Sequence, residues 1–355
     1  MPIPMESTRN FRVLGAMSGT SLDGLDLVLV HFEQKSNWKF SIEKALTIPY
    51  SKEWKLKLTS AQTCSGMELK LIDLAFSDYC AQAMKAFLDG EQVDFIASHG
   101  HTIFHEPERG LTHQIVDPSM IAAVTGCDVI ADFRMKDVCL GGQGAPLVPI
   151  GDSLLFSEYE ACVNIGGFAN VSLTRGTNRM AWDISAANIV LNALVQPFGL
   201  NYDEEGQLAR KGKVDARLLA QFEQLAYFKS AAPKSLGREW VEREITPLLT
   251  RDFSTEDLLA TFSEHIALRI AADLSLVKGE VLFTGGGVYN SFLMERIQEH
   301  GQFEAVVPKA ELVEFKEALI FAFLGVLWKM DEPNALADFT GARRNHVSGV
   351  YVRGN

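Results

Sequence analysis

Residues 11–32 read FRVLGAMSGTSLDGLDLVLVHF, two apolar segments joined by a short polar segment that contains two glycines. The apolar segments Phe11–Met17 and Leu25–Phe32 have the length and composition of strands. The connecting residues Ser18–Gly24 are rich in turn formers, and a tight glycine-containing loop between two strands is typical of a β-hairpin. Trp38–Ile48 is a candidate third strand, so we expect the chain to open with a hairpin and an adjoining strand.

A similar pattern returns in the second half of the chain. Ala161–Ile165 and Phe168–Leu173 are predicted strands, and Gly166 and Gly167 form the turn between them. The echo predicts two related α/β lobes, and a cleft between two lobes is a common place for a ligand.

A glycine-rich stretch, GGQGAP at residues 141–146, separates the two patterns. We therefore expect the main domain boundary near residue 150, with an N-terminal lobe at 1–150 and a C-terminal lobe at 151–355. The last helix of the chain is expected either to stay with the second lobe or to pack back on the first.

The rest of the chain alternates between helical and strand-like periodicity. A long helical period covers Gly66–Leu88, and Gly90 marks its end. Proline in a first turn favours a helix that starts at Asp117–Ser119. The other predicted elements are strands at Val93–Ala97, Asp128–Ala131, Met180–Trp182 and Val281–Phe283, and helices at Ser185–Gln196, Tyr289–Gln298 and Lys316–Lys329.

Composition and charge exclude several classes of protein. The chain has 355 residues, 47% hydrophobic and 22% charged, which excludes a disordered or fibrous chain. A net charge of −12 argues against nucleic acid as a partner. We expect no secretory signal in the polar segment Met1–Asn10, and the longest apolar run, Leu319–Trp328, is too short to cross a membrane. The five cysteines lack CxxC spacing and are expected to be reduced thiols.

The loop of the first hairpin has the chemistry of a phosphate site. Its glycines let the backbone approach an anion, and consecutive amides can surround phosphate oxygens. Ser18, Thr20 and Ser21 add hydroxyl donors, and the carboxylate of Asp23 is a candidate magnesium ligand. No Gly-Lys-Ser/Thr follows, so this is not a Walker loop. A plain hairpin turn remains the alternative.

Two further glycine loops support this interpretation. Asn164, Gly166 and Gly167 form a second turn. A single Gly-Gly turn usually has no role in binding. If this turn and the first face each other across a cleft, the two could hold a polyphosphate from both sides. The third loop, Gly285–Gly287 followed by Asn290, lies between a strand and a helix. A helix N-terminus favours anions and a bare backbone leaves room for a flat ring, so this loop is a candidate adenosine site.

Asp183 follows the predicted strand Met180–Trp182 and precedes a helix that Ser185 is expected to cap. A carboxylate in this position is either a general base that takes a proton from water or a hydroxyl, or a second capping group. Glu317 lies at the start of the last predicted helix, where a charge is usually solvated or compensates the helix dipole.

Polar residues at the ends of two strands are candidates for a sugar site. Four neighbouring histidines raise the question of a metal, but no HExxH pattern is present and substrate hydrogen bonding is favoured. Arg134 could hold a carboxylate or a sugar with its planar donor fork, and the alternative is an ion pair with Asp132. The histidines are His99, His101, His105 and His113.

Seven stretches in order resemble the anhydro-N-acetylmuramic acid kinases, from about Val13 to about Trp328. They read GAMSGTSLDGLD, ASHGHTIFHEP, IADFRMKDVCLGGQGAPLVP, NIGGFANVS, PKSLGRE, TGGGVYNSFL and EALIFAFLG. The resemblance implies the two-lobed actin-like ATPase fold, a duplicated ribonuclease H-like arrangement of mixed sheets flanked by helices around an interlobe cleft. It also implies a cytoplasmic homodimer that acts in cell-wall recycling.

The resemblance implies a kinase with ATP and Mg²⁺ that couples two events. Water opens the 1,6-anhydro bond of 1,6-anhydro-N-acetylmuramic acid, and the freed O6 accepts the γ-phosphoryl group. The products are N-acetylmuramic acid 6-phosphate and ADP. Phosphoryl transfer needs positioning and charge neutralisation more than covalent help, which agrees with glycine loops and a cation.

The same resemblance assigns roles to individual residues. Asp183 would activate water and Glu317 would help to position it. Asp23 would lie near magnesium. His99, His101, Asp132 and Arg134 would lie near the sugar. The ATP-binding set comprises Ser18, Gly19, Thr20, Ser21, Leu22, Asp23, Gly24, Leu25, Asp26, Asn164, Gly166, Gly167, Gly285, Gly286, Gly287 and Asn290.

The chain departs from the family pattern in two places. The family usually has Asp-Thr-Gly-Pro, a small residue and Asn around the base, whereas residues 183–188 read DISAAN. His101 stands where Gln is common. Both changes concern the sugar side, so a kinase of the same fold that acts on another anhydro or amino sugar is the alternative. A non-catalytic, ATP-gated clamp is a third hypothesis, and the presence of both Asp183 and Glu317 argues against it.

Overall fold

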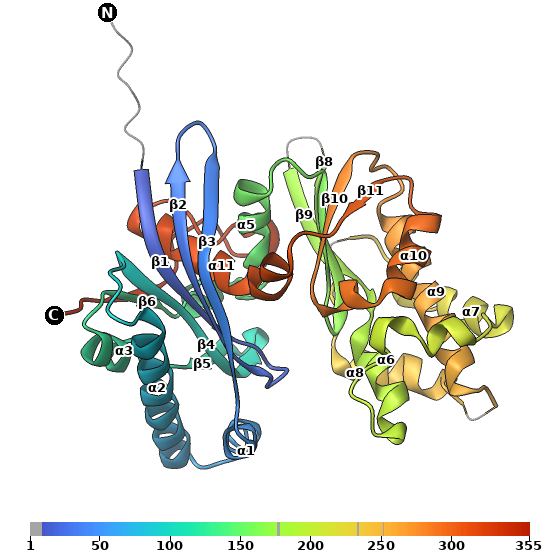
Figure 1. Ribbon diagram of the computed structural model, residues 1–355, viewed down its shortest axis with the longest axis horizontal. Coiled ribbons are helices and arrows are strands. Elements are labelled where there is room, and N and C mark those ends of the chain that lie inside the picture. The colour runs from blue at the N-terminus through green and yellow to red at the C-terminus, as the bar shows by residue number, and fades with distance from the viewer. Residues whose placement is uncertain (1–8, 176–177, 233, 251) are drawn as a thin grey trace, which may run out of the picture. The chain divides into compact units, whose positions relative to one another are not determined.

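The computed structural model describes residues 9–175, 178–232, 234–250 and 252–355 (Figure 1). The chain divides into two compact units. The first contains Met1–Leu155 and Phe315–Asn355, and the second contains Phe156–Glu314. The second unit therefore ends well before residue 355, and the last long helix contributes most of its length to the first unit.

A seven-stranded sheet forms the centre of the first unit, with the order β12-β6-β4-β1-β2-β3 and with β5 paired to β4. The expected opening hairpin is confirmed, because β1, β2 and β3 pair antiparallel in sequence order. β4 lies parallel to β1 and to β6. The strands are β1 (Arg9–Ser18), β2 (Gly24–Gln34), β3 (Trp38–Pro49), β4 (Phe95–Glu106), β5 (Leu111–Ile115), β6 (Val129–Ala131) and β12 (Val350–Val352).

Helices cover both faces of this sheet. Successive residues of a strand point to opposite sides, so one strand can contact helices on both faces. Leu14 and Ala16 of β1 share a core with Phe76 of α2. Gly15 points to the other face, where an added Cβ would lie 2.3 Å from the carbonyl oxygen of Ala318 in α11. The helices are α1 (Lys52–Ser60), α2 (Gly66–Leu88), α3 (Pro118–Thr125), α4 (Met135–Cys139), α5 (Val148–Leu155), α11 (Ala310–Lys329) and α12 (Ala337–Thr340), with a 3₁₀ turn, η1 (Pro107–Arg109).

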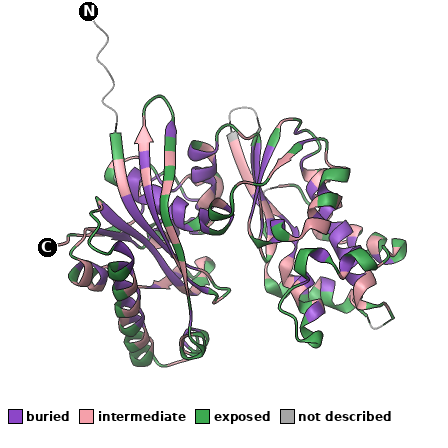
Figure 2. Ribbon diagram, in the orientation of Figure 1, coloured by how far each residue is buried: buried purple, intermediate pink, exposed green. Residues whose placement is uncertain are grey.

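This layering appears in the burial of the strands (Figure 2). β1, β2 and β4 are buried along most of their length, whereas the outer strand β3 alternates between partly buried and exposed residues. Strands covered on both faces read as continuous apolar runs, which is why residues 25–32 show no alternation.

The second unit contains a five-stranded sheet with the order β11-β10-β7-β8-β9. β7, β8 and β9 form an antiparallel meander, and β10 and β11 run parallel to β7. The expected mixed α/β class, with two sheets flanked by helices, is therefore confirmed. The strands are β7 (Ala161–Ile165), β8 (Phe168–Arg175), β9 (Asn178–Ala186), β10 (Glu280–Thr284) and β11 (Glu304–Val306).

One face of this second sheet forms the unit's hydrophobic core. Val163, Val171 and Trp182 from three adjacent strands pack there with Phe262 of the long helix α9. The helices are α6 (Asn188–Val195), α7 (Ala216–Glu223), α8 (Arg238–Trp240), α9 (Thr255–Asp273) and α10 (Ser291–His300). Short turns of helix lie at η2 (Gln196–Phe198), η3 (Glu204–Gly206), η4 (Ala209–Lys211), η5 (Ala226–Lys229), η6 (Val241–Ile245), η7 (Thr246–Leu248) and η8 (Gly286–Tyr289).

Several element boundaries differ from the sequence prediction. β4 continues through the histidine segment to Glu106, because β5 folds back and pairs with it. β9 extends past the predicted Met180–Trp182 and includes both Asp183 and Ser185. The prediction that Ser185 caps the next helix is therefore wrong: α6 begins at Asn188, and its N-cap residue, Ala187, has no side chain that could act as a cap.

The two later helices are also shifted. α10 begins at Ser291, because the residues before it form the turn η8. α11 begins at Ala310, so Glu317 lies inside the helix and not at its start. Across the described residues, every helix is too short or too polar to span a bilayer.

Candidate functional site

The turn of the first hairpin presents three polar side chains to solvent. Thr20, Ser21 and Asp23 are exposed, while Leu22 adopts a left-handed conformation with φ 62° and donates its amide to the carbonyl of Gly19 at 3.3 Å. Gly24 must be glycine here, since a Cβ would lie 2.5 Å from the carbonyl oxygen of Ile48. The turn thus combines two exposed residues that carry hydroxyls with one exposed residue that carries a carboxylate.

The hydroxyl of Ser18 lies beneath this turn and is buried. The Tyr50 hydroxyl donates to Ser18 Oγ at 2.6 Å, and Ser18 Oγ lies 2.9 Å from Nδ1 of His101. Burial lowers the pKa of His101 to about 4, so the imidazole is neutral at neutral pH. In the same hairpin, Asp26 accepts a hydrogen bond from Thr47 at 2.6 Å. The Ser18 and Asp26 side chains are thus hydrogen-bonded within the protein, whereas the side chain of Asp23 has no hydrogen bond to another described residue.

Buried His99 and half-buried Arg134 form a second cluster of this unit. Arg134 Nε donates to Nε2 of His99 at 2.8 Å, and Nδ1 of His99 lies 3.0 Å from the carbonyl of Gly100. Because Nε2 accepts a hydrogen bond, the proton lies on Nδ1, which donates to that carbonyl. Burial, followed by the Arg134 charge, lowers the pKa of His99 well below its ordinary value. His99 is therefore a neutral ring with a defined tautomer.

Arg134 is held from a second side as well. Its Nη1 donates to the carbonyl of Gly144 at 2.6 Å, and its guanidinium lies over the Phe321 ring at 5.7 Å. Burial lowers the pKa of Arg134 to about 10, and the charges of Glu317 and Asp137 oppose this shift.

The alternative of an Asp132–Arg134 ion pair is not found among the ion pairs of the described residues. Asp132 is exposed at the end of β6, with a positive φ of 55°. Its Oδ1 accepts the amide of Met135 at 3.3 Å, at the start of α4. The two residues therefore have separate structural roles, although they are neighbours in sequence.

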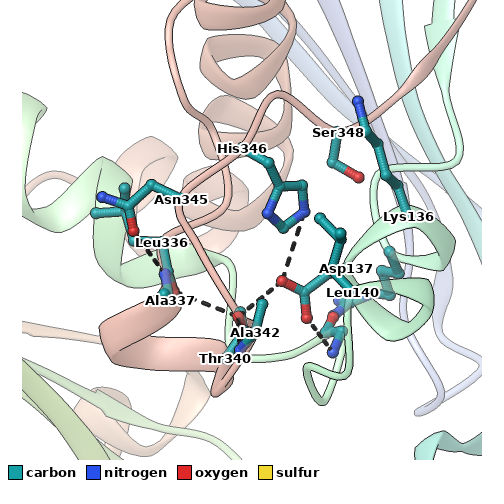
Figure 3. Close-up of polar contacts among 12 residues, drawn as sticks. Lys136, Asp137, Leu140, Leu336, Ala337, Thr340, Ala342, Asn345, His346 and Ser348 are labelled. Atoms are coloured by element: carbon teal, nitrogen blue, oxygen red, sulfur yellow. Dashed lines mark hydrogen bonds and ion pairs between the residues drawn. The ribbon is translucent and has the colours of Figure 1, made fainter.

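Asp137 holds the Gly144 loop, and the sequence analysis did not select it. Figure 3 shows its contacts with Thr340 and His346. Asp137 is fully buried; Oδ2 accepts the amide of Gly144 at 2.7 Å, and Oδ1 accepts the hydroxyl of Thr340 at 2.7 Å. Nε2 of His346 lies 3.6 Å from the same Oδ1. The only local sequence feature that could have indicated Asp137 is its position one helical turn before a glycine loop. Its other partners, Thr340 and His346, come from the far end of the chain.

Glu317 lies on α11, next to a buried ion pair. Lys316 Nζ contacts Oδ1 of Asp152 at 2.8 Å, with both side chains almost inaccessible to solvent. The Glu317 side chain itself is accessible to solvent, although dense protein surrounds it. This environment raises the pKa of Glu317, and the charges of Arg134 and Lys316 act in the opposite direction. Glu317, Arg134 and His99 thus share one region of the first unit.

In the second unit, the two glycine loops pack on each other. Gly285 has a φ of 84°, and an added Cβ would lie 2.8 Å from the carbonyl oxygen of Ile165 and 2.7 Å from Oδ1 of Asn164. A Cβ on Gly287 would lie 2.2 Å from Cγ2 of Ile165. Both glycines are therefore required by close approach.

The amides and side chains that flank these loops also have defined partners. The carbonyls of Gly166 and Gly167 accept the amides of Asn188 and Ile189 at the start of α6, at 3.1 Å each. Asn290 caps α10 through its Oδ1, which accepts the amide of Leu293 at 3.0 Å. The Asn290 side chain is thus a helix cap in this structure, and Gly286 is exposed beside it.

A polar row crosses the sheet of the second unit on the face opposite its core. Thr284 pairs with Asn164, Asn164 with Asn170, and Asn170 with Asp183, so four adjacent strands contribute one residue each. Directly paired residues have side chains on the same face. Asn170 lies between two predicted site residues, and only its position in NIGGFANVS could have indicated it.

Asp183 is held at three atoms by one neighbouring segment. Its amide donates to the Lys234 carbonyl at 3.0 Å, and its carbonyl accepts the Tyr227 hydroxyl at 2.6 Å. Its Oδ2 accepts the amide of Leu236 at 2.8 Å. Burial raises the pKa of Asp183, and the Leu236 amide partly offsets that shift. The PKSLGRE motif supplies two of these partners, and its Pro233 lies outside the described residues.

A metal site built from protein side chains alone is not found in the described ranges: they hold no group of three or more His, Cys, Asp or Glu that could bind an ion. His105 instead contacts the hydroxyl of Thr112 at 3.1 Å, across the β4–β5 hairpin, and His113 stacks on Phe104. A cation near Asp23 would need most of its oxygen ligands from phosphates and water, which suits Mg²⁺ bound with a nucleotide.

Each α/β unit carries a glycine-containing hairpin, and backbone amides of glycine-rich loops bind phosphates in many enzymes that transfer phosphoryl groups. The family model described as anhydro-N-acetylmuramic acid kinase matches residues 11–353. A relative of that name from Idiomarina loihiensis is 34% identical in an alignment of 366 positions that covers 96% of this chain and 98% of the relative. Another, from Shewanella pealeana, is 37% identical in an alignment of 363 positions that covers 95% of this chain and 97% of the relative.

The chain therefore belongs to the anhydro-N-acetylmuramic acid kinase family. Among solved structures, the activator of the 2-hydroxyisocaproyl-CoA dehydratase from Clostridium difficile with bound ADPNP aligns over 90% of this chain and 97% of its own length. The sequence identity is 14% and the TM-score 0.45, a likeness too distant to assign a function.

Proposed function

We propose that this chain uses ATP and water to convert 1,6-anhydro-N-acetylmuramic acid to N-acetylmuramic acid 6-phosphate and ADP. The observation that carries the proposal is the family match over residues 11–353. Water attacks the anomeric carbon, the bond from that carbon to O6 breaks, and O6 takes the γ-phosphoryl group. One proton of the water goes to a protein base, and ADP leaves.

Asp183 is the base in this proposal. Its partly buried carboxylate and raised pKa support the assignment, because a base works best when its pKa approaches the operating pH. Glu317 helps to position the water, and its accessible carboxylate supports that role. The departing O6 is neutralised by the phosphoryl group that it accepts, so the protein needs no second carboxylate as an acid, unlike common glycosidases.

Backbone amides and small polar groups bind the ATP phosphates. Residues 18–26 of the first hairpin and Asn164, Gly166 and Gly167 of the second contact them, and residues 285–287 with Asn290 contact adenosine. Mg²⁺, bound with Asp23 directly or through water, neutralises phosphate charge. The exposed hydroxyls and carboxylate of the first turn and the close-packed glycines of the later loops support this assignment.

His99, His101, Asp132 and Arg134 form the sugar side. The neutral ring of His101 and the guanidinium of Arg134, which His99 and Gly144 hold in place, support hydrogen bonding to an uncharged sugar ring and to its carboxylate. The proposal also includes a homodimer in the cytoplasm, as the family resemblance implies.

A second candidate, a kinase that acts on another anhydro or amino sugar, rests on the DISAAN segment. Ser185 and Ala186 stand there where the family usually has Gly and Pro, and both are buried residues of β9. A panel of anhydro and amino sugars distinguishes the two candidates by which sugar stimulates ADP release.

The deciding experiment is an ADP-release assay with Mg-ATP, with and without 1,6-anhydro-N-acetylmuramic acid, followed by mass spectrometry of the sugar. The expected product is heavier than the substrate by one water and one phosphoryl group. Asp183→Asn should abolish turnover while ATP still binds, as measured by calorimetry. Full activity of that variant would refute the base assignment, and ATP binding without sugar-dependent ADP release would refute the substrate.

A further inference from the structure

A segment formed by residues 227–232 and 234–236 contacts the open edge of the second sheet at Asp183. β9 is the edge strand, and Asp183 is the residue at which this segment contacts it through main-chain groups. An unpaired strand edge carries free amides and carbonyls, and a segment that bonds to them holds the edge in place. We call residues 227–232 and 234–236 the strap; its contacts with Asp183 come from Tyr227, Lys234 and Leu236.

The strap holds the backbone of Asp183 on both sides of its Cα. The Lys234 carbonyl accepts the Asp183 amide at 3.0 Å, and the Tyr227 hydroxyl donates to the Asp183 carbonyl at 2.6 Å. Lys234 in turn donates its Nζ to the carbonyl of Tyr227 at 3.2 Å and lies 4.5 Å from the centre of the Tyr227 ring. The strap is thus bonded to itself as well as to the strand.

The strap also contacts the carboxylate, and it does so at one oxygen. The amide of Leu236 donates to Oδ2 at 2.8 Å. Within the described part of the chain, Oδ1 receives no hydrogen bond. A carboxylate with one oxygen bound to an amide has its rotation restricted and offers the other oxygen to a reacting group.

We propose that the strap is a positioning device for the base: it fixes the backbone of Asp183 and binds Oδ2, so that Oδ1 is the atom that takes the proton from the attacking water. This inference rests on the proposed function, because it needs Asp183 to act as the base. It assigns Tyr227 and Leu236 as positioning residues, and it gives the PKSLGRE segment a role in catalysis that acts through Asp183.

The Leu236 amide acts on the pKa of Asp183 together with the burial of that residue and the charged groups around it. Burial raises the pKa of Asp183, and the amide bond lowers it by stabilising the ionised form. Tyr227, on the strap, is neutral because burial raises its pKa, with the charges of Asp183 and Asp273 adding to the shift. Lys234, on the strap, and Asp273 and Arg269, on α9, also carry charge in this region, and Glu223 of α7 pairs with Arg269 at 3.1 Å.

Removal of the Leu236 amide should therefore make the base harder to ionise. Leu236→Pro deletes the donor, and the matched control Leu236→Ala truncates the side chain and keeps the amide. For the proline variant, the acidic limb of the kcat/KM profile for the sugar should move up by about 0.5–1 pH unit, with kcat several-fold lower and the KM for ATP unchanged. The alanine variant should keep the wild-type limb. If the acidic limb of the kcat/KM profile lies at the same pH in the proline and alanine variants, the proposal is overturned.

A second pair of variants keeps the test decisive if the proline prevents folding. Tyr227→Phe removes only the hydroxyl that binds the Asp183 carbonyl, and the matched control Tyr202→Phe changes an exposed tyrosine of the same unit. Tyr227→Phe should lower kcat about three- to tenfold with the KM for ATP unchanged, since one neutral hydrogen bond contributes about 1 kcal/mol. A wild-type kcat for Tyr227→Phe would overturn the positioning role.

Asp183→Asn separates failure of this inference from failure of the proposed function. If that variant is inactive while the strap variants behave like their controls, the base assignment stands and the strap is only structural. If Asp183→Asn keeps its activity, the base assignment fails and the inference fails with it.

Discussion

His99 and His101 are two residues apart on one strand, yet their environments give them different partners. His99 accepts from Arg134 and donates to a backbone carbonyl, whereas His101 contacts Ser18. Both are nearly inaccessible to solvent, and burial lowers the pKa of each. These residues can therefore be neutral hydrogen-bonding groups at the pH where the enzyme works, and acid should disturb the region that they share.

The stability of the protein should fall between pH 8 and pH 5, in part because of His101. Its pKa is about 4 in the folded chain and about 6.5 when unfolded, so in this window the unfolded state binds more protons. His101 alone should account for a loss of about 2 kcal/mol between the two pH values. Urea unfolding at both pH values measures this loss, and His101→Gln should show a correspondingly smaller one. An equal loss in both proteins would contradict the assignment.

At the level of elements, glycines decide where loops can meet. The turns after β7 and β10 approach each other so closely that Gly285 and Gly287 leave no space for a methyl group, whereas a Cβ added to Gly286 would have nothing within 4 Å. The sequence predicts all three as one loop, and the structure separates them into two packing glycines and one exposed glycine. A side-chain rotation cannot relieve an overlap with backbone atoms. The loss of stability on substitution by alanine should therefore differ between these adjacent glycines.

Gly285→Ala should therefore destabilise the protein by about 2 kcal/mol or more, from the backbone overlap and the positive φ together. Gly286→Ala is the matched control and should change the free energy of unfolding by less than about 0.5 kcal/mol. Both values come from urea unfolding. Similar values for the two variants would show that the loops do not pack as described.

At the scale of the whole molecule, the end of the chain returns to the first unit and completes it. α11 packs on β1 through Gly15, and the segment after it brings Thr340 and His346 to Asp137 (Figure 3). Asp137 in turn holds the loop whose carbonyl binds Arg134. A contact across 203 residues of sequence thereby supports a candidate sugar-binding group.

Thr340→Val tests this link, because it keeps the shape of the side chain and removes the donor to Asp137. Loss of this hydrogen bond to the buried Asp137 carboxylate should lower the free energy of unfolding by about 1–3 kcal/mol. Thr59→Val, in α1, removes an exposed hydroxyl that donates to Lys55 and should stay within about 0.5 kcal/mol of wild type. Urea denaturation measures both, and a neutral Thr340→Val would contradict the role of the contact.

By itself the sequence determined the local features of this protein. Periodicity predicts the helix Gly66–Leu88 with the bounds that it has, because the capping residues and apolar positions that specify it are neighbours in the chain. Strand–glycine–strand patterns likewise predict both hairpins, and the ordered motifs indicate the family that the match over residues 11–353 shows.

Only the tertiary structure decided which distant residues meet. The contacts Tyr50–Ser18–His101, Thr340–Asp137 and Leu236–Asp183 depend on strand register and on packing between segments far apart in sequence. Local periodicity contains no information about such pairings. For the same reason the sequence predicted Ser185 as a cap and Glu317 at a helix start. In the structure, Ser185 belongs to a paired strand and Glu317 lies inside a packed helix.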